Sequence, residues 1–90
     1  MFYNVNREVL KLYIKISNKI LRKLRYVAGL SQRELGEKIG VSQEAVSRYE
    51  SGSLSISKDK ENEIIGVLMD SGLSKTDISL LVSVLDAGNL

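Results

Sequence analysis

Cysteine and histidine are both absent from this chain of 90 residues. The lack of cysteine excludes disulfide bonds and thiol nucleophiles, and the lack of histidine removes the most common general base. A glycine-rich phosphate loop is also missing, because Gly36 and Gly40 lack the lysine and hydroxyl residue of that motif. The acidic residues Asp59, Glu61 and Glu63 are typical of a solvated helix start. We therefore expect no enzyme, no metal site and no cofactor.

Long apolar runs are absent as well. The longest candidate, 78–85, has eight residues and includes a serine, whereas a membrane-spanning helix needs ~20 apolar residues. Arg7, Glu8, Lys11 and Lys15 interrupt the amino-terminal region, which lacks the apolar core of a signal peptide. We therefore expect one small cytoplasmic domain, and a domain of this size would gain stability from dimerisation.

The net charge of +2 conceals an uneven distribution. Residues 1–28 carry a net charge of +6, residues 29–56 carry −1 and residues 57–90 carry −3. This asymmetry favours a surface for phosphates in the basic half and a different surface in the acidic half. An alternative of equal weight is that the lysines of the first half only solvate a helix face, as Lys11, Lys15 and Lys19 would.

The segment 31–52 predicts two short helices joined by a glycine turn. Ser31 and Glu34 have the spacing of a capping box, in which each side chain satisfies the backbone amide of the other residue. Gly40 is placed to end this first helix in a left-handed conformation, and Ser42 is a good N-cap for the second. Two helices this short need a third to pack against, and the preceding segment is the best candidate.

Each of the two helices has one apolar side. Leu35 and Ile39 form it in the first helix, and Gly36 beside them would allow another helix to approach closely. The inward residues of the second helix are Ala45, Val46 and Tyr49. Polar residues occupy the opposite side of the second helix, which is therefore free to contact a partner.

This segment resembles the lambda-repressor-like (Cro/C1, XRE) helix-turn-helix family. The usual motif of that family has a small residue in the first helix, a glycine in the turn and an aliphatic residue in the second helix. Gly36, Gly40 and Val46 match those places, as do the flanking stretches GLSQ (29–32), GVS (40–42) and VSRYESG (46–52). The resemblance implies an all-α DNA-binding domain over about residues 17–72.

Outside the motif, helical spacing predicts helical structure in four further segments, of which the first two could form one helix. A first helix over about 6–15 would turn Val9, Leu10, Tyr13 and Ile14 inward, although the stretch YIKIS also alternates like a strand. The next, over about 17–28, would bury Ile20, Leu21, Leu24, Val27 and Ala28 and could continue directly from the first. The last two would cover about 57–69 and 74–87. We expect a small all-α bundle of about five helices, with residues 1–16 as an N-terminal helical extension.

The helix expected within 73–90 is apolar over a wide arc. A helix that only covers a small domain needs a narrower stripe, so part of this surface should remain uncovered. We expect a homodimer interface made of Ile78, Leu81, Val82 and Leu85. The alternative is that the helix only completes the core of the monomer.

The second helix of the motif carries the candidate base-reading residues. The major groove admits an α-helix whose amino-terminal side chains reach base edges. The candidates are Gln43, Glu44, Ser47 and Arg48. Gln43 can pair bidentately with adenine, and family members commonly contact bases from the matching position. Glu44 could accept from cytosine, or could form an ordinary ion pair with Arg48.

Candidate phosphate-binding residues surround that helix. They are Arg25, Gln32, Arg33, Ser42, Ser53 and Ser55, of which Gln32 matches the usual phosphate-binding glutamine of the family. The serines could instead be simple cap or turn residues. The resemblance also implies that Arg25 pairs with Glu50 and braces the second helix; the alternative is that both are solvated charges.

These observations predict a sequence-specific regulator of transcription that binds double-stranded DNA. We expect a homodimeric repressor that occupies an inverted-repeat operator. The alternative is an antitoxin or adaptor that uses the same fold to bind a protein partner, which would contact the acidic carboxy-terminal half.

Overall fold

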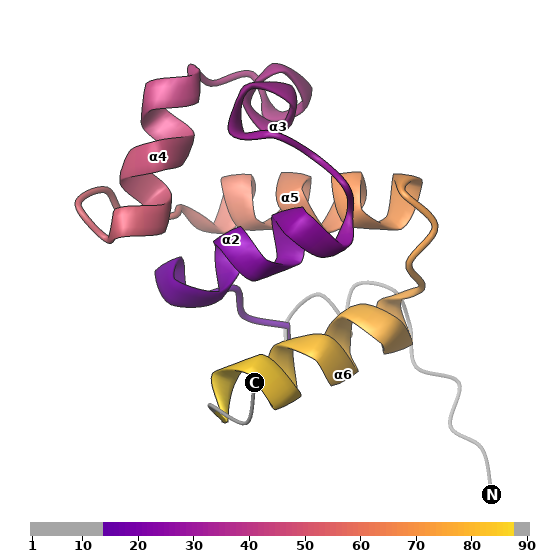
Figure 1. The fold of residues 1–90 in the computed structure, drawn as a ribbon. Helices are drawn as coiled ribbons and strands as arrows, with labels where there is room; N and C mark the ends of the chain where they lie inside the picture. The colour runs from indigo at the N-terminus through magenta and orange to yellow at the C-terminus, as the bar shows by residue number, and fades with distance from the viewer. Residues whose placement is uncertain (1–13, 88–90) are drawn as a thin grey trace, which may run out of the picture.

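The computed structural model describes residues 14–87, which form five α-helices and no strand (Figure 1). The helices are α2 (Asn18–Val27), α3 (Gln32–Ile39), α4 (Gln43–Ser51), α5 (Lys58–Asp70) and α6 (Lys75–Asp86). The predicted fold class, a small all-α bundle, is confirmed. No helix in this part of the chain is long and apolar enough to cross a membrane.

The start of the described chain differs from the expected helix over 6–15. Residues up to 13 lie outside the described residues, and residues 14–17 are not helical, so α2 does not continue from a preceding helix. Ile14 and Ile16 are buried and Lys15 is exposed, which is the alternation of an extended chain. The competing interpretation of the YIKIS stretch is therefore the better one for these residues.

Glu61 was expected to be a solvated residue, and the structure corrects this. Its side chain is buried. Oε2 accepts a hydrogen bond from the backbone amide of Ile16 at 3.0 Å, and Oε1 accepts one from Nζ of Lys58 at 2.9 Å. A buried carboxylate needs such partners to offset its desolvation. Glu61 thus anchors the extended segment to the first turn of α5.

Local capping sets the helix starts. Oγ of Ser31 accepts the Glu34 amide at 3.0 Å and the Glu34 carboxylate accepts the Ser31 amide at 2.9 Å, so the predicted capping box is present. Ser42 caps α4 by accepting the amide of Ala45 at 3.0 Å. Gly40 adopts the left-handed conformation expected of it, with φ of 73°.

The helices enclose one core, to which α2 and α5 contribute Ile20, Leu21, Leu24, Ile64, Ile65 and Leu68. In Figure 1, α3 and α4 lie on one side of α2, and α6 lies on the other. The last helix packs against α2 and α5. The surface of α3 and α4 is therefore separate from the surface of α6.

The side of α6 that faces the core differs from the expected interface. Ile78 and Leu85 are 0% and 5% exposed and belong to the monomer core, and Leu81 and Val82 are half-buried. Leu80 and Val84 are the large apolar side chains that this helix exposes. Val27 of α2, expected to be buried, is also exposed. An apolar groove lies here, lined by Val27, Leu73, Asp77, Leu80, Leu81 and Val84.

Candidate nucleic-acid interface

The angle between α3 and α4 depends on the absence of a side chain at Gly36. A Cβ atom there would lie 2.6 Å from the backbone oxygen of Val41, far inside contact distance. The amide of Val41 also donates to the oxygen of Gly36 at 2.9 Å. The expected close approach at Gly36 is thus made by the turn itself, which fixes where α4 begins.

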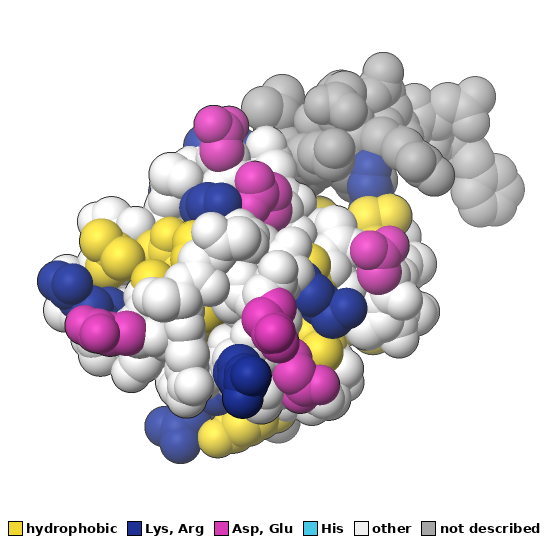
Figure 2. All heavy atoms as spheres, turned by 90° about the horizontal axis from the view of Figure 1, so that it is seen from above, with side chains coloured by type: hydrophobic (Ala, Val, Ile, Leu, Met, Phe, Trp, Pro, Cys, Tyr) yellow, Lys and Arg dark blue, Asp and Glu magenta, His cyan; other side chains and the backbone are white. Residues whose placement is uncertain are grey.

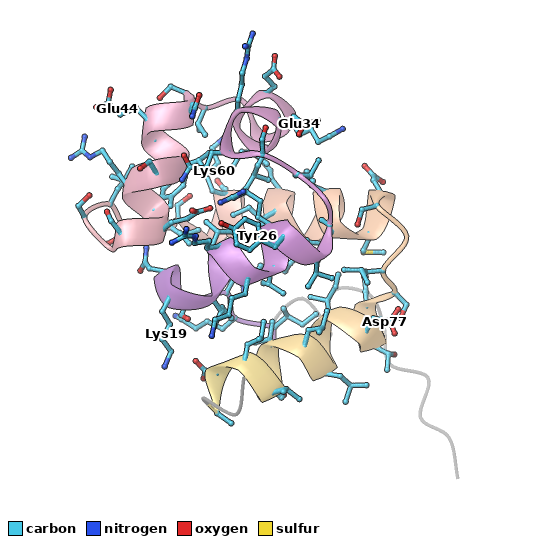
Figure 3. All side chains as sticks on the ribbon, viewed as in Figure 1. Lys19, Tyr26, Glu34, Glu44, Lys60 and Asp77 are labelled. Atoms are coloured by element: carbon cyan, nitrogen blue, oxygen red, sulfur yellow. The ribbon has the colours of Figure 1, made fainter. Side chains whose placement is uncertain are left out.

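One side of α4 is buried and the other is exposed, as the residue types predict. Val46 and Tyr49 are buried and Ala45 is half-buried. The four candidate base-reading residues, Gln43, Glu44, Ser47 and Arg48, are all exposed. Figure 3 shows Glu44 directed away from the other helices. Glu44 and Arg48 both lie among the described residues, and no ion pair joins them. The structure therefore does not contain the intrahelical ion pair that was the alternative to base reading.

A hollow of about 530 Å³ lies where α2, α3 and α4 meet. Its lining residues are Arg22, Arg25, Tyr26, Ser31, Gln32, Gln43, Ser47, Glu50 and Ser51. The structure therefore brings Gln43, Ser47 and Gln32 together around one concavity. Glu44, Arg48, Arg33, Ser42, Ser53 and Ser55 are exposed outside its lining.

Arg25 and Glu50 form a bidentate ion pair at the base of this hollow. Nε and Nη2 of Arg25 donate to the two Glu50 carboxylate oxygens at 2.7 and 3.2 Å, and Nη1 donates to the carbonyl of Leu30 at 2.9 Å. The side chains are 7% and 6% exposed. This pair joins α2 to the last turn of α4 and to Leu30, two residues before α3 begins.

The electrostatics of Glu50 follow from its partners. Burial raises the pKa of the Glu50 carboxyl, but hydrogen bonds from Arg25 and Gln32 outweigh burial and hold the pKa below its ordinary value. The hydrogen bond to Glu50 likewise raises the pKa of Arg25. Nε2 of Gln32 donates to Oε1 of Glu50 at 3.0 Å. Both members of the pair are therefore charged, and the Glu50 carboxylate accepts three hydrogen bonds, two from Arg25 and one from Gln32.

The candidate phosphate-binding residues have different surroundings. Arg25 has little exposed surface for a phosphate, and Gln32 is half-buried with its amide directed to Glu50. Ser42 is occupied as a helix cap. Ser53 is exposed, with its hydroxyl 3.1 Å from Oγ of Ser51. Arg33 and Ser55 are exposed. The phosphate role of all six stays a prediction.

Sequence reasoning missed two contacts that position α4 and α3. Nδ2 of Asn18 donates to the carbonyls of Tyr49 and Leu54 at 2.7 and 3.0 Å, which ties α2 to the end of α4. Nζ of Lys60 donates to the carbonyl of Ile39 at 2.7 Å, at the negative end of the α3 dipole. Asn18 is 31 residues from Tyr49, and no local signal links them.

Charges of both signs cover the face that includes α3 and α4. Figure 2, which views the molecule from above, shows blue and magenta side chains interspersed on this face. Within residues 14–87 no group of three or more acidic residues could hold a metal ion. Exposed hydrogen-bonding groups on α4, rather than a uniform positive field, are thus the main chemical feature here.

Comparison with known proteins agrees with this geometry. Residues 21–60 match a protein-family model described as helix-turn-helix, which runs from α2 through α3 and α4 into the first turn of α5. No curated protein and no solved structure matched the chain. The resemblance to Cro/C1-type proteins is confirmed by the family match. Over residues 21–60 the chain is thus similar to the helix-turn-helix family of the Cro/C1 (XRE) type.

Proposed function

We propose that this protein is a sequence-specific regulator of transcription that binds double-stranded DNA with α4 in the major groove. The observation that carries the proposal is the exposed polar side of α4, held on a helix that is fastened to its neighbours. The Arg25–Glu50 pair and Asn18 fasten the end of α4, and Gly36 fixes its beginning. A fixed helix presents its side chains to the groove at a lower ordering cost on binding than a mobile helix would.

The base-reading residues have complementary chemistry. The Gln43 amide can donate to and accept from adenine, and the Arg48 guanidinium can donate twice to guanine or hold a phosphate. Glu44 can accept from the amino group of cytosine, and Ser47 lies between them on the same side. Because Glu44 and Arg48 are not paired with each other, neither contact requires an existing ion pair to break. Gln43 also lines the hollow, next to the proposed phosphate-binding residue Gln32.

We further propose a homodimeric repressor that acts by occupying its operator. The exposed apolar residues Val27, Leu80 and Val84 support a dimer contact that involves the 73–90 segment. This surface lies on the other side of α2 from α3 and α4 (Figure 1), so a dimer contact does not compete with DNA. A regulator that covers a promoter blocks polymerase without a further domain.

The same apolar groove favours a second candidate function, an antitoxin or adaptor that binds a protein partner there. Asp77 lines the groove, which would suit a partner with a basic group beside an apolar centre. DNA binding separates the two candidates. The affinity of a DNA-binding protein falls steeply with salt because phosphate neutralisation releases counterions.

Selection of the purified protein against a randomised duplex library tests the proposal. The expected result is enrichment of an inverted repeat with half-sites about one helical turn apart. Gln43→Ala should weaken binding to the selected site by roughly 1–3 kcal/mol and relax the preference at one base position. Thr76→Ala, which removes an exposed polar group from the first turn of α6, is the matched control and should change neither.

Two other outcomes are informative. Enrichment of a single half-site would retain DNA reading and reject the dimer. The absence of any enrichment, even at low salt, would reject the DNA-binding proposal and favour the adaptor. If Gln43→Ala bound like the parent with the same preference, Gln43 would not read a base.

A further inference from the structure

Two residues of α2, Arg22 and Tyr26, lie on the wall of the hollow that faces the beginning of α4. They line the same concavity as Gln43, Ser47 and Gln32, although they precede the motif in the sequence. Both are exposed, and Tyr26 is 58% exposed despite its size. Tyr26 is not part of the hydrophobic core, so its ring is available at the surface of the hollow.

Arg22 and Tyr26 are preorganised with respect to each other. Nε of Arg22 donates to the hydroxyl oxygen of Tyr26 at 3.0 Å. The guanidinium carbons of Arg22 and Arg25 lie 5.6 and 4.7 Å from the centre of the Tyr26 ring, within cation–π range. Two cations therefore lie close to the ring, and Figure 3 shows Tyr26 beside α2.

The pair offers donors that remain free. The Tyr26 oxygen accepts from Arg22, so its own hydrogen can point to a third group. The terminal nitrogens of Arg22 make no hydrogen bond or ion pair within residues 14–87. The hydrogen bond from Arg22 lowers the pKa of Tyr26, which makes its hydroxyl a better donor to an anion.

The charge balance of the hollow selects a negative ligand. The charge of Arg25 is matched by Glu50 in a buried bidentate pair, whereas Arg22 forms no ion pair with any described residue. Gln43, which would contact bases, opens into the same hollow. A duplex engaged by α4 would therefore carry its sugar–phosphate backbone past this wall.

We propose that Arg22 and Tyr26 form a phosphate-binding clamp for the DNA backbone, with the guanidinium and the hydroxyl donating to one phosphate group. This inference rests on the proposed DNA-binding function and adds α2 to the interface. The contact is independent of sequence, because phosphates carry no base information, and it sets the register of α4 in the groove. The ring of Tyr26 keeps the guanidinium in place, so less freedom is lost when the phosphate binds.

Salt titrations with the full chain and a short random-sequence duplex test the clamp. Arg22→Gln should weaken binding roughly tenfold, as expected for a charged hydrogen bond, and should reduce the slope of log K against log salt by about 1. Tyr26→Phe keeps the ring and should weaken binding with little change in slope. Arg22→Lys should keep the slope. Lys23→Gln, which removes the same charge from the adjacent exposed residue outside the hollow, should leave affinity and slope close to the parent's.

The outcomes separate the clamp from the function on which it rests. If the parent binds DNA but Arg22→Gln behaves like Lys23→Gln, the clamp is rejected and DNA binding stands. A loss confined to the selected operator and absent on random DNA would also reject it, because Arg22 would then read bases. If the parent fails to bind any duplex at low salt, the proposed function falls first and the clamp with it. Far-ultraviolet circular dichroism confirms that each variant is folded.

Discussion

The Arg25–Glu50 pair holds α4 in place. The three guanidinium nitrogens of Arg25 and the two carboxylate oxygens of Glu50 all form hydrogen bonds at this one buried site. Two side chains that are 7% and 6% exposed lose most of their hydration, so the pair is stable only because its geometry is bidentate and because Gln32 and the Leu30 carbonyl supply further bonds. Removal of one partner leaves the other charge buried. The pair is thus a sensitive element of the interface although it reads no base.

Glu50→Gln should lower the free energy of unfolding by about 3 kcal/mol at neutral pH, because Arg25 then lacks a counter-charge. The pKa of Glu50 in the folded protein lies below its ordinary value. Its contribution is therefore complete above the unfolded-state pKa and is lost as the pH falls through the folded-state pKa. Urea denaturation at several pH values should show a smaller loss on acidification, between about pH 5 and pH 3, for the variant than for the parent.

Glu37→Gln is the matched control for that measurement, since Glu37 is an exposed carboxylate on α3. It should leave the stability at neutral pH nearly unchanged. Equal stabilities of the parent and Glu50→Gln across this pH range would show that the ion pair does not stabilise the fold.

At the scale of elements, the turn between α3 and α4 leaves too little space for a side chain at residue 36. The backbone oxygen of Val41 lies only 2.6 Å from the position where residue 36 would have its Cβ atom. Gly66 in α5 provides a contrast, because nothing lies within 4 Å of the Cβ position there. One glycine is required by packing and the other is not.

Gly36→Ala should destabilise the protein by about 1–3 kcal/mol, since the turn must move to accept a methyl group. Gly66→Ala should stabilise it by about 0.5–1 kcal/mol, because alanine loses less conformational freedom in a helix interior. Thermal and urea unfolding of the two variants against the parent measures both. A Gly36→Ala protein as stable as the parent would mean that the turn can relax and does not fix α4.

At the scale of the whole molecule, the surfaces of α4 and α6 lie apart. The proposed DNA-contacting side chains lie on α4 and around the hollow, whereas Leu80, Val84 and Val27 expose an apolar groove on the other side of α2. This separation allows one molecule to contact DNA and a second protein molecule together. It also means that a substitution in the groove should leave the isolated DNA contacts intact.

Leu80→Glu should convert the proposed dimer to a monomer, because Leu80 is 61% exposed on the groove and a charge there would be buried in the dimer contact. Light scattering at high micromolar concentration measures the mass. Thr76→Glu, an exposed position of α6 that does not line the groove, should remain dimeric. A parent protein that is monomeric under these conditions would reject the homodimer.

Local chemistry within a few residues was enough to predict the helix starts at Ser31 and Ser42, the left-handed Gly40 and the exposed polar side of α4. A cap or a glycine turn involves neighbours three or four positions away, so the local sequence is enough to predict it. Contacts between distant segments needed the packed structure. Glu61 receives the amide of Ile16 from 45 residues away, and the orientation of α6 turned Ile78 and Leu85 inward and left Leu80 exposed.

The hollow has the same origin. Arg22 and Tyr26 are ordinary helix residues in the sequence, and they line the hollow because α2 packs against α4. Residue type and spacing determine which side chains a helix can present. The docking of one helix on another determines which of them meet, because burial of the shared core selects a single arrangement among many compatible with the same pattern.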